Sequence, residues 1–179
     1  ANTAVLVEVD AIKTIKLTVT GLQDGADEKL VLDADQALDT GFNGSNKEIN
    51  NITGVDYTYV ANTGLLTISK HGGGEFSTAE AQAIIRGLEY KNSKTAPTDG
   101  DRSFAFVVTD KVGNGSTASN AVIKIDTTAP TLDLDANANG GDYAVVVSKT
   151  AAAAGVSLDD AANTAVLVEV DAIKTIKLT

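Results

Sequence analysis

Short runs of alternating apolar and polar residues recur along most of the chain and predict β-strands. Within residues 12–19, for example, Ile15, Leu17 and Val19 occupy one set of alternate positions. In a strand this alternation sends the two sets of side chains to opposite faces of the sheet, so that one set is buried. Gly, Asp and Asn clusters separate the runs, as turn residues do. The clearest predicted strands are residues 4–9, 12–19, 29–33, 56–60, 65–70, 102–109, 117–125, 131–135 and 143–148.

One segment has the signature of a helix instead. Ser77 is followed three residues later by Glu80, which is the spacing of a capping box. The residues that follow place Ala79, Ala83 and Ile84 on one helical face. We therefore expect a helix of roughly two to three turns that crosses between two sheets. Many strands, frequent turns and a single helix predict an all-β sandwich with one short crossover helix.

The first and last segments of the chain are identical. Residues 1–18 and residues 162–179 both read ANTAVLVEVDAIKTIKLT, an offset of 161 residues (162 − 1). Solenoid repeats have periods of roughly 20–50 residues, whereas this offset has the size of a domain. We expect one period of a tandem array followed by an overlap into the next period, cut from a longer polypeptide. An engineered duplication of the ends is the alternative.

A short stiff linker divides the period. Residues 126–130 read DTTAP, in which Pro130 fixes its own φ and favours an extended Ala129. We predict a β-sandwich module over residues 1–129 that lacks its opening strands. Residues 130–179 would then be the opening segment of the next repeat, a partial second module lying beyond the first sandwich. Its predicted partners are neighbouring repeats of the same chain, with head-to-tail contact between chains as a further expectation.

Composition excludes several function classes. There are 24 acidic and 14 basic residues and the net charge is −10, which disfavours nucleic acids and anionic membranes as partners. Cysteine is absent, so disulfides and thiolate sites are excluded. No apolar run reaches the roughly 18 residues that a membrane helix needs, and we predict no direct membrane insertion.

The sequence offers little support for catalysis. The only histidine, His71, lies in a Lys-His-Gly-Gly-Gly string that resembles an oxyanion-hole motif. No G-x-S-x-G nucleophile motif accompanies it. We interpret the glycines as a turn before the helix and predict that the protein is not an enzyme.

Two motifs carry a resemblance to a known family. They are the turn DKVGN at residues 110–114 and the linker DTTAP at residues 126–130. With the surrounding residues 64–135 they resemble the cadherin-like and bacterial Ig-like modules of giant repetitive adhesins, including RTX adhesins exported by type I secretion. The match covers the second half of the period well, and residues 20–55 match weakly.

The resemblance implies a fold, a function and a location. The fold would be an Ig-like or cadherin-like β-sandwich, and the module would be an extender that projects a distal ligand-binding region. Calcium at the junctions would stiffen the rod, which would serve adhesion and biofilm formation at the extracellular bacterial cell surface. The alternatives are a repeated glycan- or protein-binding module, and an envelope-layer matrix protein with homotypic contacts.

An acidic segment after the linker predicts a calcium site on chemical grounds. Ca²⁺ takes about six to eight oxygen ligands. Residues 132–142 read LDLDANANGGD, which matches the first positions of an EF-hand loop but lacks its final Glu, since Val146 stands there. An ordinary Asx-rich turn is the alternative. The predicted ligands in this segment are Asp133, Asp135, Asn137, Asn139 and Asp142.

A second calcium site is predicted at the junction. We expect Asp110 and Asp126 to converge with Asp133 and Asp135 at one pole of the sandwich, where a divalent cation would relieve the repulsion between their carboxylates. The alternative is that Asp110 caps its own turn and that Asp126 is solvated.

The remaining acidic candidates are weaker. Asp27 lies in a loop, and Asp10 and its copy Asp171 flank a strand bend, so that a solvated surface is the main alternative for each. Two further acids, at positions 99 and 101, are expected to pair with the nearby Arg102.

Overall fold

The computed structural model describes residues 5–7, 10–133 and 166–168. The chain divides into two compact units, residues 1–127 and residues 128–179.

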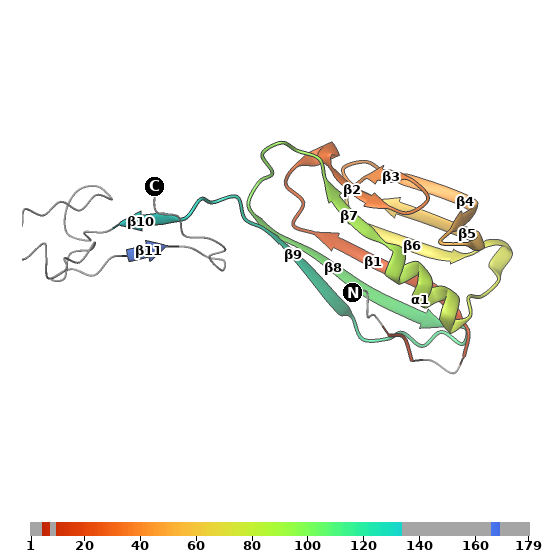
Figure 1. Ribbon diagram of the computed structural model, residues 1–179. Helices are drawn as coiled ribbons and strands as arrows, with labels where there is room; N and C mark the ends of the chain where they lie inside the picture. Colours follow the sequence, from red (N-terminus) through yellow and green to blue (C-terminus); the bar gives the residue numbers. More distant parts are fainter. Residues whose placement is uncertain (1–4, 8–9, 134–165, 169–179) are drawn as a thin grey trace, which may run out of the picture. The chain divides into compact units, whose positions relative to one another are not determined.

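Two antiparallel sheets form the first unit, and this confirms the predicted β-sandwich (Figure 1). In the described part of this unit the one α-helix, α1 (Thr78–Gly87), lies between a strand of the large sheet and a strand of the small sheet along the chain, as a crossover helix does. The small sheet has the order β3 (Asp35–Ala37), β2 (Glu28–Val31), β7 (Glu89–Asn92). The large sheet has the order β4 (Phe42–Ile49), β5 (Ile52–Val60), β6 (Leu65–Lys70), β1 (Ile12–Thr20), β8 (Gly100–Asp110), β9 (Ser119–Ile125).

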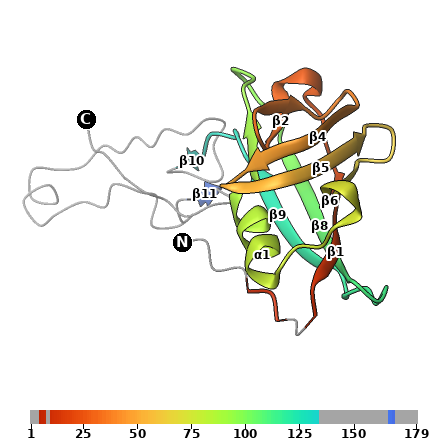
Figure 2. The ribbon, with the colours of Figure 1, turned by 90° about the vertical axis from the view of Figure 1, so that its right-hand side faces the viewer.

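The core lies between the large sheet and the layer formed by α1 and the small sheet (Figure 2). The alternation expected in β1 is confirmed, because Ile15, Leu17 and Val19 are buried. From the other layer, Leu30 of β2 and Ile84 of α1 are buried as well. The residues of the two layers therefore share one apolar cluster.

The capping box at the start of α1 is confirmed. The Ser77 hydroxyl oxygen accepts the N–H of Glu80 at 3.2 Å, and the Glu80 carboxylate accepts the N–H of Ser77 at 2.8 Å. The predicted buried face was partly wrong. Ala81 and Ile84 are buried, whereas Ala79 is exposed.

Some strands of the first unit were not predicted from the sequence, and the described part of one predicted strand is not a strand. β4 is rich in Asn, Gly, Ser and charged residues, yet it pairs with β5 at the edge of the large sheet. Gly44 is required there because a β-carbon would overlap the ring of Tyr57. A strand was predicted at residues 4–9; its described part, residues 5–7, has no strand conformation.

The chain enters and leaves the first unit at opposite ends of the large sheet. β1 is antiparallel to β8, and β8 is antiparallel to β9, so β1 and β9 run in the same direction. We call the end that holds Ile12 and Asp110 the entry pole, since these two residues are partners in the β1–β8 register. The end that holds Gly100 and Ile125, partners in the β8–β9 register, is the exit pole.

The described part of the second unit is a two-stranded antiparallel ladder. β10 (Thr131–Asp133) pairs with β11 (Val166–Val168), with Leu132 opposite Leu167. β11 has the same sequence as residues 5–7, because it belongs to the repeated segment. The predicted strand at residues 143–148 lies outside the described residues. In the part of the chain that the structure describes, the one α-helix has ten residues, and no helix is long and apolar enough to span a bilayer.

Candidate functional site

Asp110, a predicted calcium ligand, closes its own turn at the entry pole. Its Oδ1 accepts the N–H groups of Val112 at 2.9 Å and Asn114 at 2.8 Å, and its Oδ2 accepts the Asn114 side-chain amide at 2.8 Å. Burial acts to raise the pKa of Asp110, but these hydrogen bonds outweigh it and leave the pKa below its ordinary value. The carboxylate is thus fixed as a turn cap.

The predicted convergence of Asp110 and Asp126 at one pole is wrong. Asp110 ends β8 at the entry pole, whereas Asp126 follows Ile125 at the exit pole, because β8 and β9 form an antiparallel hairpin. The length of β8 separates them, about 30 Å for ten residues at ~3.3 Å each. A single ion within one sandwich therefore does not bind both side chains.

Two weaker candidates are also held by polar partners. Asp10 forms an ion pair with Lys111 at 3.2 Å, again at the entry pole. Asp27 ends a single 3-10 turn, Gly25–Asp27, and accepts the hydroxyl of Ser93 at 2.8 Å. Asp133 lies on β10, opposite Val166. The other predicted ligands, Asp135, Asn137, Asn139, Asp142 and Asp171, lie outside the described residues.

The described carboxylates among the predicted ligands accept from hydrogen-bond donors or pair with an ammonium group. Within residues 5–7, 10–133 and 166–168, no group of three or more His, Cys, Asp or Glu residues is placed to hold a metal. The oxygens of Asp110 accept from N–H groups, and the carboxylate of Asp10 pairs with the exposed ammonium group of Lys111. These contacts do not test calcium binding, which stays a prediction for Asp126 and for the acidic segment 133–142.

A buried charge cluster at the exit pole was not expected from the sequence. The guanidinium of Arg102 is fully buried; its Nε donates to Glu28 at 2.7 Å and its Nη2 donates to Asp24 at 3.0 Å. A third nitrogen, Nη1, donates to the carbonyl oxygens of Thr98 at 2.8 Å and Gly100 at 3.0 Å. One side chain on β8 thus ties together the loops before β2 and before β8.

Further hydrogen bonds complete this cluster. Asp24 also accepts from Lys94 at 2.6 Å, and burial raises its pKa less than these bonds lower it, so that the pKa lies far below the ordinary value. Glu28 accepts the hydroxyl of Tyr90 at 2.6 Å. Burial, followed by this bond to Glu28, raises the pKa of Tyr90 to about 12. Each carboxylate of the cluster therefore has a partner of opposite charge.

The expected pairing of Arg102 with Asp99 and Asp101 is wrong. Arg102 shares one face of β8 with Phe104, and this face points into the core, where only carboxylates distant in sequence are available. That strand face is the sequence signal that would have found the cluster. Asp99 instead accepts the N–H of Thr127 at 2.8 Å and its hydroxyl at 2.6 Å, which fixes the start of the linker to the exit pole.

A Ser, His and Asp do meet on the surface, but not as a catalytic relay. The Nδ1 of His71 lies 3.0 Å from Asp56 and 3.4 Å from the hydroxyl of Ser45. A relay needs the acid and the nucleophile at different ring nitrogens. Here both lie at the same nitrogen, and Ser45 itself donates to Asp56 at 2.9 Å.

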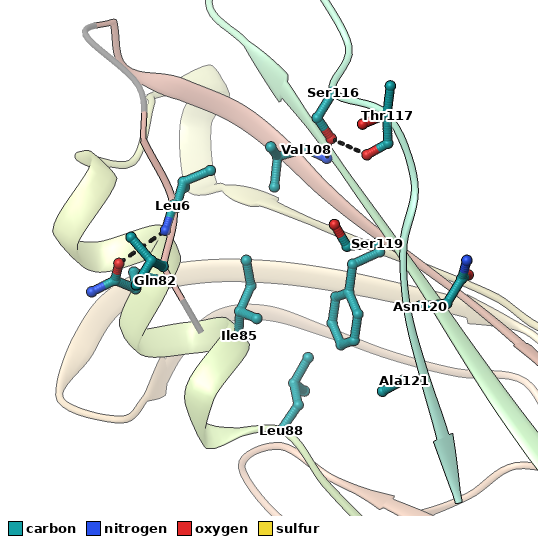
Figure 3. A pocket seen from close by; sticks show the side chains of 12 residues that line it. Leu6, Gln82, Ile85, Leu88, Val108, Ser116, Thr117, Ser119, Asn120 and Ala121 are labelled. Atoms are coloured by element: carbon teal, nitrogen blue, oxygen red, sulfur yellow. Dashed lines mark hydrogen bonds between the residues drawn. The ribbon is translucent and has the colours of Figure 1, made fainter. Parts of the chain in front are cut away.

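An apolar groove opens beside β9, one of the two edge strands of the large sheet (Figure 3). Its volume is about 480 Å³. Ile85 and Leu88 line one wall from α1 and its C-terminal end, and Phe106 and Ala121 line the other from β8 and β9. Leu6 also lines the groove, where its N–H donates to the side-chain oxygen of Gln82 at 3.0 Å. The groove is therefore open along one side of the sandwich.

No family model, curated protein or solved structure matches this sequence.

Proposed function

We propose that the chain is a structural extender repeat of a bacterial surface adhesin, which projects a distal ligand-binding region for adhesion and biofilm formation. The observation that carries this proposal is the placement of the entry and exit points at opposite poles of the large sheet. A unit built in this way adds its length to an array instead of folding back. The exact repeat of residues 1–18 at residues 162–179 supports the array.

The strand arrangement also suits transmission of tension. Force applied through Ile12 and Ile125 acts along β1 and β9, in opposite directions on strands joined through β8. Inter-strand hydrogen bonds lie perpendicular to the strands, so this force shears all of them together. Resistance to extension then comes from the whole ladder and not from one bond at a time.

The anchored linker supports the same proposal. The N–H of Thr127 donates a hydrogen bond to Asp99, and Arg102 holds the loop that contains Asp99 by donating to the carbonyl oxygen of Thr98. Tension from the linker therefore enters the sandwich at a pole that is held together by hydrogen bonds and ion pairs. Stiffening by calcium belongs to the proposal through the acidic segment 133–142 and the adhesin resemblance.

Small-angle scattering from chains of one, two and three periods tests the extender role. The maximum dimension should rise by a constant increment with each added period. A maximum dimension that stays nearly constant as periods are added would contradict the proposal.

Thermal melting of the three-period chain in calcium and in chelator tests the ionic part separately. We expect a higher melting temperature and a narrower distribution of interatomic distances in calcium. An unchanged melting temperature would remove calcium from the mechanism and leave the extender role standing on the scattering result.

A further inference from the structure

The apolar groove beside β9 lies next to a segment whose second copy in the chain has a strand partner. Val5–Val7 and Val166–Val168 have the same sequence and the same flanking residues. Val166–Val168 forms β11 and pairs with β10. Val5–Val7 has no strand conformation, and Val5 and Val7 are 75% and 88% exposed. The two copies of this sequence therefore differ in backbone conformation, since one is a paired strand and the other is not.

We propose that the groove binds the β10 strand, Thr131–Asp133, of a second copy of the chain, which pairs with Val5–Val7 in the register that β10 makes with β11. This inference rests on the proposed array, in which each period supplies the same strand to the next. The second copy therefore acts as a head-to-tail partner.

The register places the right side chain in the groove. β10 pairs antiparallel with β11, and Leu132 lies opposite Leu167. Directly opposed residues of an antiparallel pair share one face of the sheet. Leu6 is the copy of Leu167 and lies in the groove, so Leu132 of the second copy enters the groove beside Leu6.

The apolar surfaces on both sides are open to this contact. Leu132 is 51% exposed. On the groove side, Val5 is exposed. Ile123 of β9 is 38% exposed and lines a smaller cavity next to the groove. The two hollows share Leu88 and Phe106. An apolar surface of this kind, rimmed by Ser and Asn residues of β9, is typical of an interaction site.

The exchange keeps the backbone pairing unchanged. β10 leaves one Val-Leu-Val segment and pairs with an identical one, so the same three residue pairs form in either arrangement. The gain comes from covering the groove, and the cost is the lost freedom of two molecules that associate. The exchange is therefore favoured by a rising protein concentration.

Disulfide trapping in the full chain tests the register. The chain has no cysteine, so Leu6→Cys and Leu132→Cys each introduce one thiol. Opposed β-carbons in an antiparallel pair lie about 4.5–5.5 Å apart, close enough for a disulfide after small adjustments. When the two variants are mixed and oxidised, we expect a disulfide-linked heterodimer on a non-reducing gel. Leu132→Cys mixed with Val112→Cys, at an exposed turn position outside the groove, is the matched control.

A second pair protects the test against misfolding of the Leu6 variant. Val7→Cys and Thr131→Cys are opposed in the same register, and Val7 is highly exposed. This pair should cross-link more than Val5→Cys with Thr131→Cys, which is displaced by two residues. Equal yields for matched and displaced pairs, or yields no higher than that of the Val112 control, would overturn the proposal. So would a homodimer of the Leu6→Cys variant as the main product, because it would show that two grooves face one another.

Sedimentation velocity of the unmodified protein checks the association itself. We expect a sedimentation coefficient that rises with concentration, an effect that Leu132→Asp abolishes and Val112→Asp retains. A monomer at every concentration would contradict the exchange. This outcome is distinguishable from failure of the extender role, because the increase in scattering dimension per period does not depend on association between chains.

A longer chain offers a competition test. When residues 130–161 are placed before Ala1, the preceding period supplies its own copy of the β10 sequence to the groove. Cross-linking of Leu6→Cys in this longer chain to Leu132→Cys of the original chain should fall several-fold. An undiminished yield would show that this strand does not fill the groove.

Discussion

At the exit pole, carboxylates are buried against a guanidinium, whereas at the entry pole a carboxylate closes its own turn. Asp24 and Glu28 are held by Arg102, and both are far from it in sequence. Asp110 is held by groups within four residues of itself. The exit pole therefore joins distant parts of the chain, and the entry pole fixes one local bend.

This difference shows that acidic residues near strand ends are held in two ways, by buried partners distant in sequence or by donors close to them. Asp10, Asp27 and Asp110 were all predicted ligands, and each faces a hydrogen-bond donor of its own unit. How much a carboxylate contributes to the stability of the fold depends on the group that donates to it. Removal of a buried guanidinium leaves its carboxylates buried without a counter-charge and is strongly destabilising. Removal of an exposed ammonium group changes the stability little.

Replacement of Arg102 should have the largest effect. Arg102→Met leaves Asp24 and Glu28 buried without their cation, which should lower the free energy of unfolding by about 3–5 kcal/mol. The matched control is Lys124→Met on exposed β9, for which we expect a change within about 0.5 kcal/mol. Urea unfolding measures both variants. Equal losses would mean that the cluster contributes nothing special.

Acid should act mainly through the exit pole. The pKa values of Asp24 and Glu28 are lowered in the folded state, so their stabilising contribution is complete above the pKa of the unfolded chain, near ~4, and is lost as the pH falls toward their folded values. The melting temperature should therefore fall steeply below pH ~4. The melting temperature of Asp24→Asn should be lower than that of the unmodified protein at neutral pH, and it should decrease less as the pH falls. If the melting temperature of this variant fell with pH as steeply as that of the unmodified protein, Asp24 would not be a source of the acid sensitivity.

Removal of the entry-pole cap should have a moderate effect. Asp110→Ala leaves the N–H groups of Val112 and Asn114 and the Asn114 amide without their acceptor. The melting temperature should fall, but by less than in Arg102→Met, whereas Asp110→Asn should retain part of the cap. A larger loss in Asp110→Ala than in Arg102→Met would reverse the order of the two poles.

The surface ion pair should have the smallest effect. Lys111→Met removes the partner of Asp10, and the two side chains are 44% and 41% exposed. An exposed pair of this kind contributes about 0–1 kcal/mol and is screened by salt. Differential scanning calorimetry at low and high salt should show nearly the same melting temperature for the variant and the unmodified protein. A loss approaching that of Arg102→Met would show that the pair is coupled to more than Asp10.

Local patterns in the sequence predicted local structure well. The alternation of Ile15, Leu17 and Val19 identified the buried face of β1, and Ser77 with Glu80 marked the start of α1. Both signals depend on residues that lie within a few positions of each other. The polar strand β4 was missed because its stability comes from pairing with β5 and not from its own composition.

Long-range contacts were beyond the same reasoning. Arg102 meets Asp24 and Glu28 across separations of 78 and 74 residues, and no short pattern encodes those distances. The groove is also a product of packing between α1 and β9. The opposite positions of Asp110 and Asp126 follow from a hairpin in which each acid stands at the end of a different strand.

Single-molecule pulling in two directions tests the mechanical role most directly. Thiol handles from Ala11→Cys and Thr127→Cys would apply force between the poles, and handles from Ala11→Cys and Val112→Cys would peel β1 from β8 at the entry pole. Pulling between the poles must shear the β1–β8–β9 ladder as a whole, so we expect a clearly higher unfolding force in that direction. Equal forces, or a lower force between the poles, would contradict the proposal that this sandwich transmits tension along an array.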